Sequence, residues 1–440
     1  MSMPGQSAAE PAVSEQDAGE QKVLFALREQ VLAGIDPTAL AGLEATQLSM
    51  MIEDMIARIA DERLVPINRF DQITLAQAIV DDILGLGPLE VLIKDPTISD
   101  ILINGHDSIY VERQGKLERT NVRFRDAAHV LFVAQRIAAD VGRRVDESSP
   151  MLDARLKDGS RVNVLLQPLA VNGPYISIRK FSREMADLET LRRNGSISEA
   201  MMTGLEIIAG SRLNVIISGG TGAGKTTLLN AMSYAISPGE RVATIEDVAE
   251  IQFSQPHVLT METRPPNIEG RGEILARDLV RNALRMRPDR IIVGEVRGGE
   301  AFDMMQAMNT GHNGSMTTIH ANTAFDAVHR IESMMQMAET NLPLHVIRSQ
   351  IFSAIDVVIQ LERMRDGVRR VVGVYQVDSY DGGEIAMAPL WEFHFTGIDA
   401  RGGILGDYRA SDRVPRFLHR LEYYGTDTAF MAALRADSGT

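Results

Sequence analysis

The 440-residue sequence contains no cysteine, which excludes disulfide bonds and thiolate metal sites and fits a reducing compartment. It has no positively charged N-terminal segment leading into an apolar stretch, so a secretory signal is not expected. No apolar run approaches the roughly 20 residues that a helix needs to cross a bilayer. We therefore expect a cytoplasmic protein, peripheral at the inner membrane through its partners.

Basic charge is also scarce. Lysine and arginine together number 45 against 59 acidic residues, which gives a formal net charge of −14. This balance argues against a general, sequence-independent grip on nucleic acid. The arginine pairs at 143–144, 192–193 and 369–370 form no basic stripe, and we interpret them as solvated or subunit-contact charges. The length allows about two to four domains.

A complete phosphate-binding loop lies near the middle of the chain. Residues 219–226 read GGTGAGKT and match G-x-x-x-x-G-K-[ST] at every fixed position. The apolar residues 213–218 before the loop predict a buried parallel strand, and the residues from Thr226 to Ala235 predict a helix. This order points backbone N–H groups and a helix N-terminus at a polyphosphate. The sequence therefore predicts binding of ATP or GTP.

Within this loop, we expect Lys225 to reach the β- and γ-phosphates and the Thr226 hydroxyl to bind Mg²⁺. The competing interpretation is a glycine-rich turn without a chemical role. The other residues expected to contact the nucleotide are Gly220, Thr221, Gly222, Ala223, Gly224 and Thr227.

Changes in composition and periodicity divide the chain into five segments. The last of them alternates strands with helices, which predicts a doubly wound parallel sheet. The segments are a disordered acidic tail at 1–20, a helical module at 21–69, an α+β domain at 70–181, an interdomain linker at 182–197, and an α/β domain with a C-terminal extension at 198–440.

Acidic residues follow two of the predicted strands. Phosphoryl transfer requires a second acid near Mg²⁺ and a residue that activates water. Glu295 ends the apolar strand 290–295, at the edge of the sheet where a ligand site is expected. Glu246, Asp247 and Glu250 close another strand, and three such carboxylates repel one another unless a cation or an arginine lies near. A solvated turn is the alternative interpretation of this cluster.

Two histidines flank the last predicted parallel strand. His312 lies in the loop before it, and His320 ends the strand at the carboxyl edge of the sheet. Neither has the spacing of a zinc pair. We interpret His320 as a sensor of the γ-phosphate and His312 as part of the scaffold. A buried histidine with satisfied hydrogen bonds is the alternative for each.

Taken in order, these motifs resemble the Walker A, Asp box, Walker B and His box of the secretion ATPase superfamily, which drives type II secretion, type IV pili and type IV secretion. The similarity runs from about Val65 to Val372 and is looser at WEFHF, residues 391–395, and in the N-terminal region. Five further stretches are similar to the motor of tight-adherence (Tad/Flp) pili, of the CpaF type: GLGPLE at 85–90, RVDESSPM at 144–151, SIRKF at 177–181, ETRPPN at 262–267 and RNALRMRPDR at 281–290.

The resemblance implies an α/β architecture in which an α+β (PAS-like) domain precedes a C-terminal RecA-like P-loop ATPase domain. It also implies a homo-hexamer with the nucleotide between these domains. It assigns water activation to Glu250 and the Walker B acid near Mg²⁺ to Glu295. It further assigns phosphate contacts to Arg161 and Arg179, from the same or a neighbouring subunit. Arginine suits this task because its planar fork grips phosphate oxygens and is always charged.

We therefore expect a hexameric, Mg²⁺-dependent ATPase that acts on an inner-membrane platform protein to assemble or retract a pilus, with the linker at 182–197 as its hinge. A traffic ATPase of type IV secretion would have the same fold and active site. A DNA-handling RecA-type motor fits poorly, because the chain is acidic and lacks a basic or aromatic groove, so no direct contact with nucleic acid is expected. A nucleotide-gated ring without turnover is a further alternative.

Overall fold

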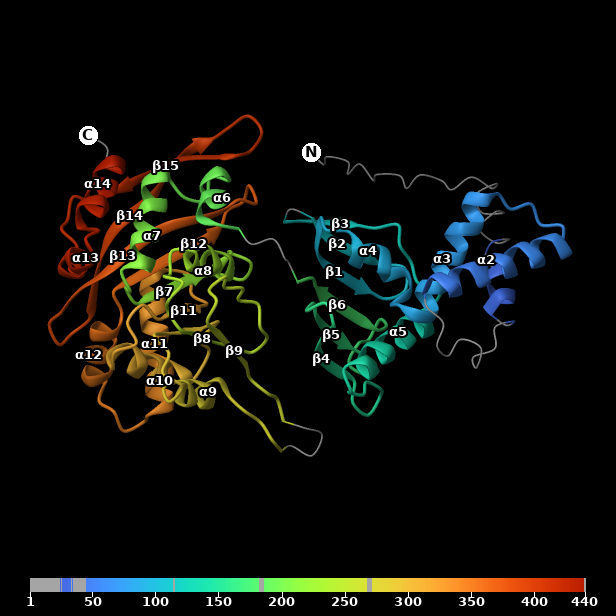
Figure 1. Cartoon of the computed structure of the whole chain (residues 1–440), viewed down its shortest axis with the longest axis horizontal. Coiled ribbons are helices and arrows are strands. Elements are labelled where there is room, and N and C mark those ends of the chain that lie inside the picture. Colours follow the sequence, from blue (N-terminus) through green and yellow to red (C-terminus); the bar gives the residue numbers. More distant parts are fainter. Residues whose placement is uncertain are drawn as a thin grey trace, which may run out of the picture. The chain divides into compact units, whose positions relative to one another are not determined.

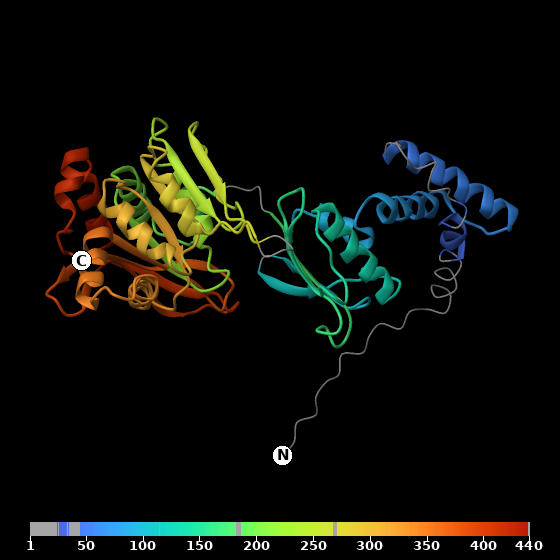
Figure 2. The same cartoon turned by 90° about the horizontal axis from the view of Figure 1, so that it is seen from below.

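The computed structural model of the chain forms two compact units, Met1–Phe181 and Ser182–Thr440, which Figures 1 and 2 show from two sides. The tail predicted at 1–20 and the first part of the predicted linker lie outside the residues that the structure describes. The described residues are 24, 26–32, 34, 45–113, 115–181, 186–266 and 271–438.

The first unit begins with helices that pack around their own apolar core. Helices α2 (Ala45–Glu62) and α3 (Arg69–Leu84) place apolar residues at spacings of three and four, so that these residues share one face. Ile52 on α2 and Ile79 on α3 are fully buried in this core. Because α3 shares the core of α2, the boundary that the sequence placed before residue 70 separates two helices that pack together.

A six-stranded antiparallel sheet with the order β3-β2-β1-β6-β5-β4 forms the rest of the first unit. Alternate strand residues, such as Val162 and Ile178, pack with Val133 and Ile137 of helix α5. The residues between them face the other way, and Arg161, Asn163, Ser177 and Arg179 among them are polar or charged. The elements are η1 (Gly87–Leu89), α4 (Glu90–Lys94), β1 (Ile98–Asn104), β2 (Ile109–Arg113), β3 (Lys116–Arg119), α5 (Ala127–Asp140), β4 (Met151–Arg155), β5 (Arg161–Leu165) and β6 (Tyr175–Arg179).

The second unit is built on a nine-stranded sheet with the order β15-β14-β13-β12-β7-β11-β10-β8-β9. From β12 to β9 neighbouring strands run parallel, and from β12 to β15 they run antiparallel. The strand before the P-loop, β7, therefore lies inside the parallel region, as in a RecA-like core, which confirms the predicted α/β fold class. The strands are β7 (Val215–Gly219), β8 (Val242–Glu246), β9 (Val258–Glu262), β10 (Arg290–Val293), β11 (Met316–Ile319), β12 (Val357–Arg363), β13 (Arg369–Tyr380), β14 (Ile385–Ile398) and β15 (Ile404–Ala410).

Helices cover both faces of this sheet (Figures 1 and 2). One apolar core joins the sheet to α7, α8, α13 and α14, and a second core joins the other face to α9, α10, α11 and α12. Among the described residues, no helix is both long and apolar enough to cross a membrane. The helices are α6 (Leu188–Arg193), α7 (Glu199–Gly210), α8 (Lys225–Ser233), α9 (Ala276–Ala283), α10 (Glu300–Asn309), α11 (Ala324–Ala338), α12 (Leu344–Ala354), α13 (Leu418–Tyr424) and α14 (Asp427–Asp437).

Helix α6 lies inside the segment that the sequence suggested as a linker. The Asp187 side chain accepts a hydrogen bond from the Thr190 amide and caps this helix. Leu188 is buried with the core of the second unit, and so is Ile197. The described part of the predicted linker is therefore packed against the second unit.

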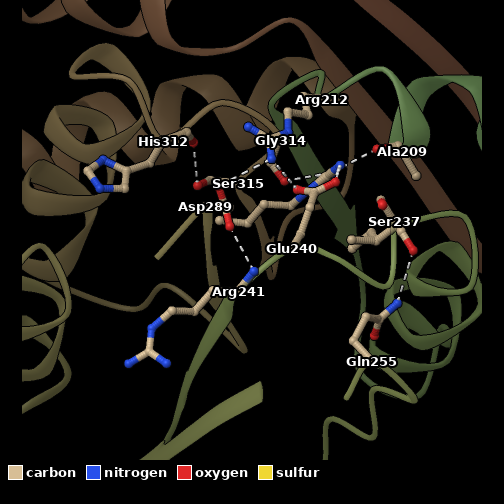
Figure 3. Close-up of polar contacts among 12 residues, drawn as sticks. Ala209, Arg212, Ser237, Glu240, Arg241, Gln255, Asp289, His312, Gly314 and Ser315 are labelled. Atoms are coloured by element: carbon tan, nitrogen blue, oxygen red, sulfur yellow. Dashed lines mark hydrogen bonds and ion pairs between the residues drawn. The ribbon is translucent and has the colours of Figure 1, made fainter. Parts of the chain in front are cut away.

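A buried ion pair joins the amino-terminal ends of the central strands. Arg290 is fully buried at the start of β10, and its Nε and Nη2 donate to the carboxylate of Glu240 at 2.7 and 2.9 Å. Its Nη1 donates to the carbonyl of Ala209, at the end of α7, at 2.7 Å. Arg212 also contacts Glu240, and Figure 3 shows both beside Gly314. A buried arginine needs such complete pairing, so this cluster holds the amino-terminal ends of the central strands in place. The carboxyl ends of the same strands form the candidate site.

Candidate active site

The predicted phosphate-binding loop connects β7 to α8 at the carboxyl edge of the parallel strands. Gly222 and Gly224 have φ angles of 71° and 96°, in the left-handed region that favours glycine. At Gly219 a Cβ atom would lie 2.6 Å from the carbonyl oxygen of Leu361 and 3.1 Å from Cβ of Ala223. The backbone itself thus requires the motif's glycines, and no other residue type fits all three positions without strain.

Lys225 is the first residue of α8 and is only 8% exposed. Its Nζ donates to the carbonyls of Gly219 and Gly220 at 2.9 and 3.0 Å. Burial lowers the pKa of Lys225, and the nearby charge of Glu295 opposes that effect. The ammonium group is therefore held against the P-loop. In this motif the backbone N–H groups of the loop point toward a bound phosphate.

His320 lies between Lys225 and Glu295. Its Nε2 is 3.3 Å from Nζ of Lys225 and 3.2 Å from Oε1 of Glu295. The two residues meet because Glu295 follows β10 and His320 follows β11, and these strands are parallel neighbours. Burial lowers the pKa of His320 and the charge of Lys225 lowers it further, against the opposite influence of Glu295. The imidazole is therefore neutral at pH 7 and has one N–H to donate.

Arg297 holds Glu295 in the ionised form. Burial alone would raise the pKa of Glu295, but the hydrogen bond from Arg297 Nη2, at 2.8 Å, and the surrounding positive charges outweigh it and lower this pKa. Nη1 of the same arginine lies 3.3 Å from Oδ2 of Asp247. Arg297 is thus the cation that the acidic cluster at 246–250 was expected to need.

Glu246 shapes the loop that carries Glu250. Its buried carboxylate accepts hydrogen bonds from the amides of Glu250 and Ile251 at 2.9 and 3.0 Å. Gly294 leaves room for this side chain, since a Cβ atom there would lie 2.7 Å from Cγ of Glu246. Of the three acids, Glu246 therefore has a structural task, and Glu250 lies partly buried at the start of the loop.

Thr226 and Glu295 carry oxygen donors that fit Mg²⁺. This ion prefers one or two carboxylates and takes its other ligands from phosphates and water. Thr226 and Thr227 lie in the first turn of α8, directly after Lys225, and Glu295 is ionised beside Lys225. In the described part of the chain, no group of three or more histidine and acidic side chains is arranged to hold a metal by itself.

A cavity of about 530 Å³ opens beside the P-loop. Asp326 and Arg330, one turn apart on α11, line it, and neither was predicted from the sequence. Both lie in the first turns of the helix that follows β11 and His320, and this position in the sequence is the signal that points to them. The cavity is lined by Gly220, Thr221, His320, Ala321, Asn322, Asp326 and Arg330.

The other two predicted site residues lie in the first unit, next to each other. Arg161 on β5 is directly opposite Arg179 on β6, and Arg155 on β4 is directly opposite Arg161. Nε of Arg179 donates to Oδ1 of Asp100 at 3.2 Å. This row of arginines lies on the face of the sheet away from α5.

His312 lies at the amino-terminal edge of the strands, the edge opposite to His320. Its carbonyl accepts a hydrogen bond from Oγ of Ser315 at 2.7 Å, and its Nδ1 lies 3.3 Å from the carbonyl of Ala307. Figure 3 shows His312 and Ser315 together near the buried ion pair. This place fits the scaffold role that the sequence suggested.

Residues 82–380 match the model of a protein family described as type II/IV secretion system protein. The chain belongs to this family. The match includes the arginine row of the first unit and the P-loop, Glu250, Glu295 and His320 of the second. Helix α2 and the hairpin of β14 and β15 lie outside it.

Relatives of this secretion family member carry names from conjugation and type IV secretion. The chain is similar to a Mycobacterium tuberculosis protein whose name refers to conjugal transfer, with 38% identity over 316 residues, 70% of this chain and 89% of that protein. It is 34% identical to the conjugal transfer protein TrbB of Rhizobium radiobacter, over 66% of this chain and 87% of TrbB. It is 33% identical to the type IV secretion system protein PtlH of Bordetella pertussis, over 64% of this chain and 91% of PtlH.

Two solved structures resemble this family member in part. The VirB11 ATPase of the Brucella suis type IV secretion system is 26% identical, with a TM-score of 0.37, over 66% of this chain and 95% of that one. The pilus retraction motor PilT with bound ADP is 19% identical, with a TM-score of 0.47, over 78% of this chain and 86% of that one.

Proposed function

We propose that this protein is an ATPase that converts ATP hydrolysis into mechanical work for a membrane machine. The observation that carries the proposal is the contact of Lys225, His320 and Glu295 beside a complete P-loop. A purely structural role would not require a neutral imidazole that lies about 3 Å from both a cation and an ionised carboxylate beside a phosphate-binding loop. Membership of the secretion family supports the same conclusion.

Each residue has a task in hydrolysis. Lys225 neutralises the β- and γ-phosphates, and Glu250 accepts the proton of the attacking water. Neutral His320 donates a hydrogen bond to the γ-phosphate and so responds to its loss. Thr226 and Glu295 would hold Mg²⁺, which supplies positive charge to the phosphate oxygens. Arg161 and Arg179 add charge from the first unit.

We further propose a homo-hexamer in the cytoplasm, in which the two units close over ATP and pass the motion to an inner-membrane platform protein. The machine that we propose is a tight-adherence pilus. The support for it is the similarity of five sequence stretches to that type of motor, and all five lie inside the family match.

A traffic ATPase of type IV secretion is the second candidate, because TrbB and PtlH are named for conjugal transfer and type IV secretion. Deleting the gene in its own host separates the two. Loss of pili with normal export and conjugation supports the pilus motor, and the reverse result supports the traffic ATPase.

Phosphate release from Mg²⁺-ATP by the purified chain tests the activity itself. Lys225→Ala should abolish both turnover and ATP binding. Glu250→Gln should lower turnover by about 10²- to 10⁴-fold, the usual contribution of a general base, while ATP still binds. Glu422→Gln, an exposed acid on α13, is the matched control and should keep normal turnover.

Normal hydrolysis by Glu250→Gln would remove the assignment of the base. Normal hydrolysis by Lys225→Ala would remove the proposal as a whole.

A further inference from the structure

Two arginines face each other where the β12–β13 hairpin reaches the P-loop. Arg363 is the last residue of β12, Arg369 is the first residue of β13, and the two are directly opposite in the antiparallel register. The sequence alone suggested that Arg369 was a solvated or subunit-contact charge.

The contacts of Arg369 place it on the phosphate-binding loop. Its Nε donates to the carbonyl of Gly222 at 2.9 Å. A Cβ atom on Gly224 would lie 3.2 Å from Cδ of Arg369, and one on Gly222 would lie 3.7 Å from Nη1 of Arg363. Both guanidinium groups therefore lie beside the backbone that cradles phosphate.

The charge of Arg369 is not paired by a neighbouring acid. Within the part of the chain that the structure describes, no carboxylate forms an ion pair with it, and its Nη groups make no hydrogen bond. The adjacent Arg370 differs, because it is buried and pairs with Asp366 at 2.9 Å. Arg370 therefore stabilises the hairpin, and Arg369 keeps two donor groups for a ligand.

The strand order shows which part of a nucleotide would meet these arginines. β7 lies between β11 and β12. His320 and Glu295, which face the γ-phosphate in the proposed function, follow β11 and β10 on one side. A nucleotide that directs its γ-phosphate to that side directs its α-phosphate and nucleoside to the other, over β12 and β13.

We propose that Arg369, with Arg363 beside it, binds the α-phosphate of the nucleotide. This inference rests on the proposed ATPase function and adds a contact made by ATP and ADP alike. A guanidinium group suits it because its donors form charge-assisted hydrogen bonds to phosphate oxygens. The site then has two sides, one that responds to the γ-phosphate and one that holds the nucleotide before and after hydrolysis.

Calorimetric titration of the full chain with Mg²⁺-ATP and with Mg²⁺-ADP tests this inference. Arg369→Ala should raise both dissociation constants by about 10- to 100-fold, the size expected for a charge-assisted hydrogen bond, and leave their ratio unchanged. Arg369→Lys should lose less because it keeps the charge. Arg365→Ala, an exposed arginine in the same hairpin, is the matched control and should bind both nucleotides normally.

Thermal unfolding separates binding from support of the loop. Arg369→Ala should leave the Tm of the nucleotide-free protein unchanged and reduce the increase that ADP produces. Normal ADP binding by Arg369→Ala, or a loss confined to ATP, would overturn the α-phosphate assignment. The assignment would also be overturned if the Tm of the nucleotide-free variant fell by as much as the ADP-induced increase in Tm was reduced, because Arg369 would then only support the loop. If the wild-type protein itself bound neither nucleotide, the proposed function would fail instead.

Discussion

Gly294, in the sequence Val-Gly-Glu, depends on a side chain from the neighbouring strand. A Cβ atom at this position would lie 2.7 Å from Cγ of Glu246, whose carboxylate holds the amides of Glu250 and Ile251. Gly294→Ala should therefore displace the loop that carries Glu250. We expect turnover to fall about tenfold or more, as misplaced catalytic groups usually cause, and the free energy of unfolding to fall by about 1–3 kcal/mol.

Phosphate release and urea unfolding measure these two effects. The control is Gly397→Ala on β14, where a Cβ atom meets nothing within 4 Å. Unchanged turnover in Gly294→Ala would show that Glu246 does not position the loop.

At the scale of single residues, the sequence predicts those candidate site residues that stand in a motif or at the end of a strand. Lys225, Glu295 and His320 are of this kind, and the structure brings them together. Arg369 and Glu246 could not be assigned in the same way, because their roles depend on which strand lies beside which loop. That information is in the order β12-β7-β11-β10-β8 and not in the spacing of residues along the chain.

Helix α5 carries a buried histidine toward helix α3, and this contact makes the pair sensitive to acid. His129 is 3% exposed, and its Nε2 lies 3.5 Å from Oδ1 of Asp82. Burial, with the charges of Arg125 and Arg28, lowers the pKa of His129 to about 4 from an ordinary value of 6.5. Between these pH values the unfolded chain binds more protons than the folded chain. Stability therefore falls as pH drops from 6.5 toward 4, by about 1.4 kcal/mol per pH unit.

Urea unfolding of the full chain at pH 7.5 and pH 5 measures this dependence. His129→Leu, which fills the same space without titrating, should reduce the loss of stability between the two pH values. An equal loss in the variant and the wild type would show that His129 is not responsible. His106, which is exposed, offers the matched control His106→Leu.

Among the elements, the alternating strands and helices around the P-loop follow the sequence closely, because buried parallel strands are short apolar runs. Strand β9 was missed because its residues are half exposed and lack a continuous apolar run. Helix α6 was assigned to a linker, although Asp187 and Thr190 form the cap that marks its start. The grouping of α3 with α2 depends on packing and has no local signal.

For the whole molecule, the main prediction concerns the arginine row of the first unit. Arg179 has a side chain that is 59% exposed, so Arg179→Ala should fold normally and lower turnover by about 10²- to 10³-fold if it stabilises phosphate charge. The turnover of mixtures of variant and wild-type subunits shows whether Arg179 acts on the nucleotide of its own subunit or of a neighbouring one. Activity that falls more steeply than the wild-type fraction indicates action on a neighbouring subunit.

Activity that follows the wild-type fraction in a straight line would contradict a role in trans. Arg123→Ala, an exposed arginine of the same unit, is the matched control and should not alter turnover.

At the scale of the whole chain, the sequence identifies the family because the motifs of both units recur in order along 82–380. It does not separate a pilus motor from a secretion motor in the same way. The chemistry at the P-loop is common to both, and the choice depends on surfaces that bind other proteins. Such surfaces consist of exposed side chains from distant parts of the chain. Their positions in the sequence follow no regular spacing, so they cannot be recognised from the sequence.

The nine-stranded sheet does not close on itself, and this affects how the protein behaves at high concentration. Within the described chain, β15 ends the sheet, and its outer edge presents backbone groups on which a second molecule can add a strand. Asp407 and Arg409 stand exposed on this strand, 2.9 Å apart, and charges at such an edge discourage aggregation. We therefore expect that replacing these two residues, which lie far from the P-loop, would lower the solubility of the isolated protein.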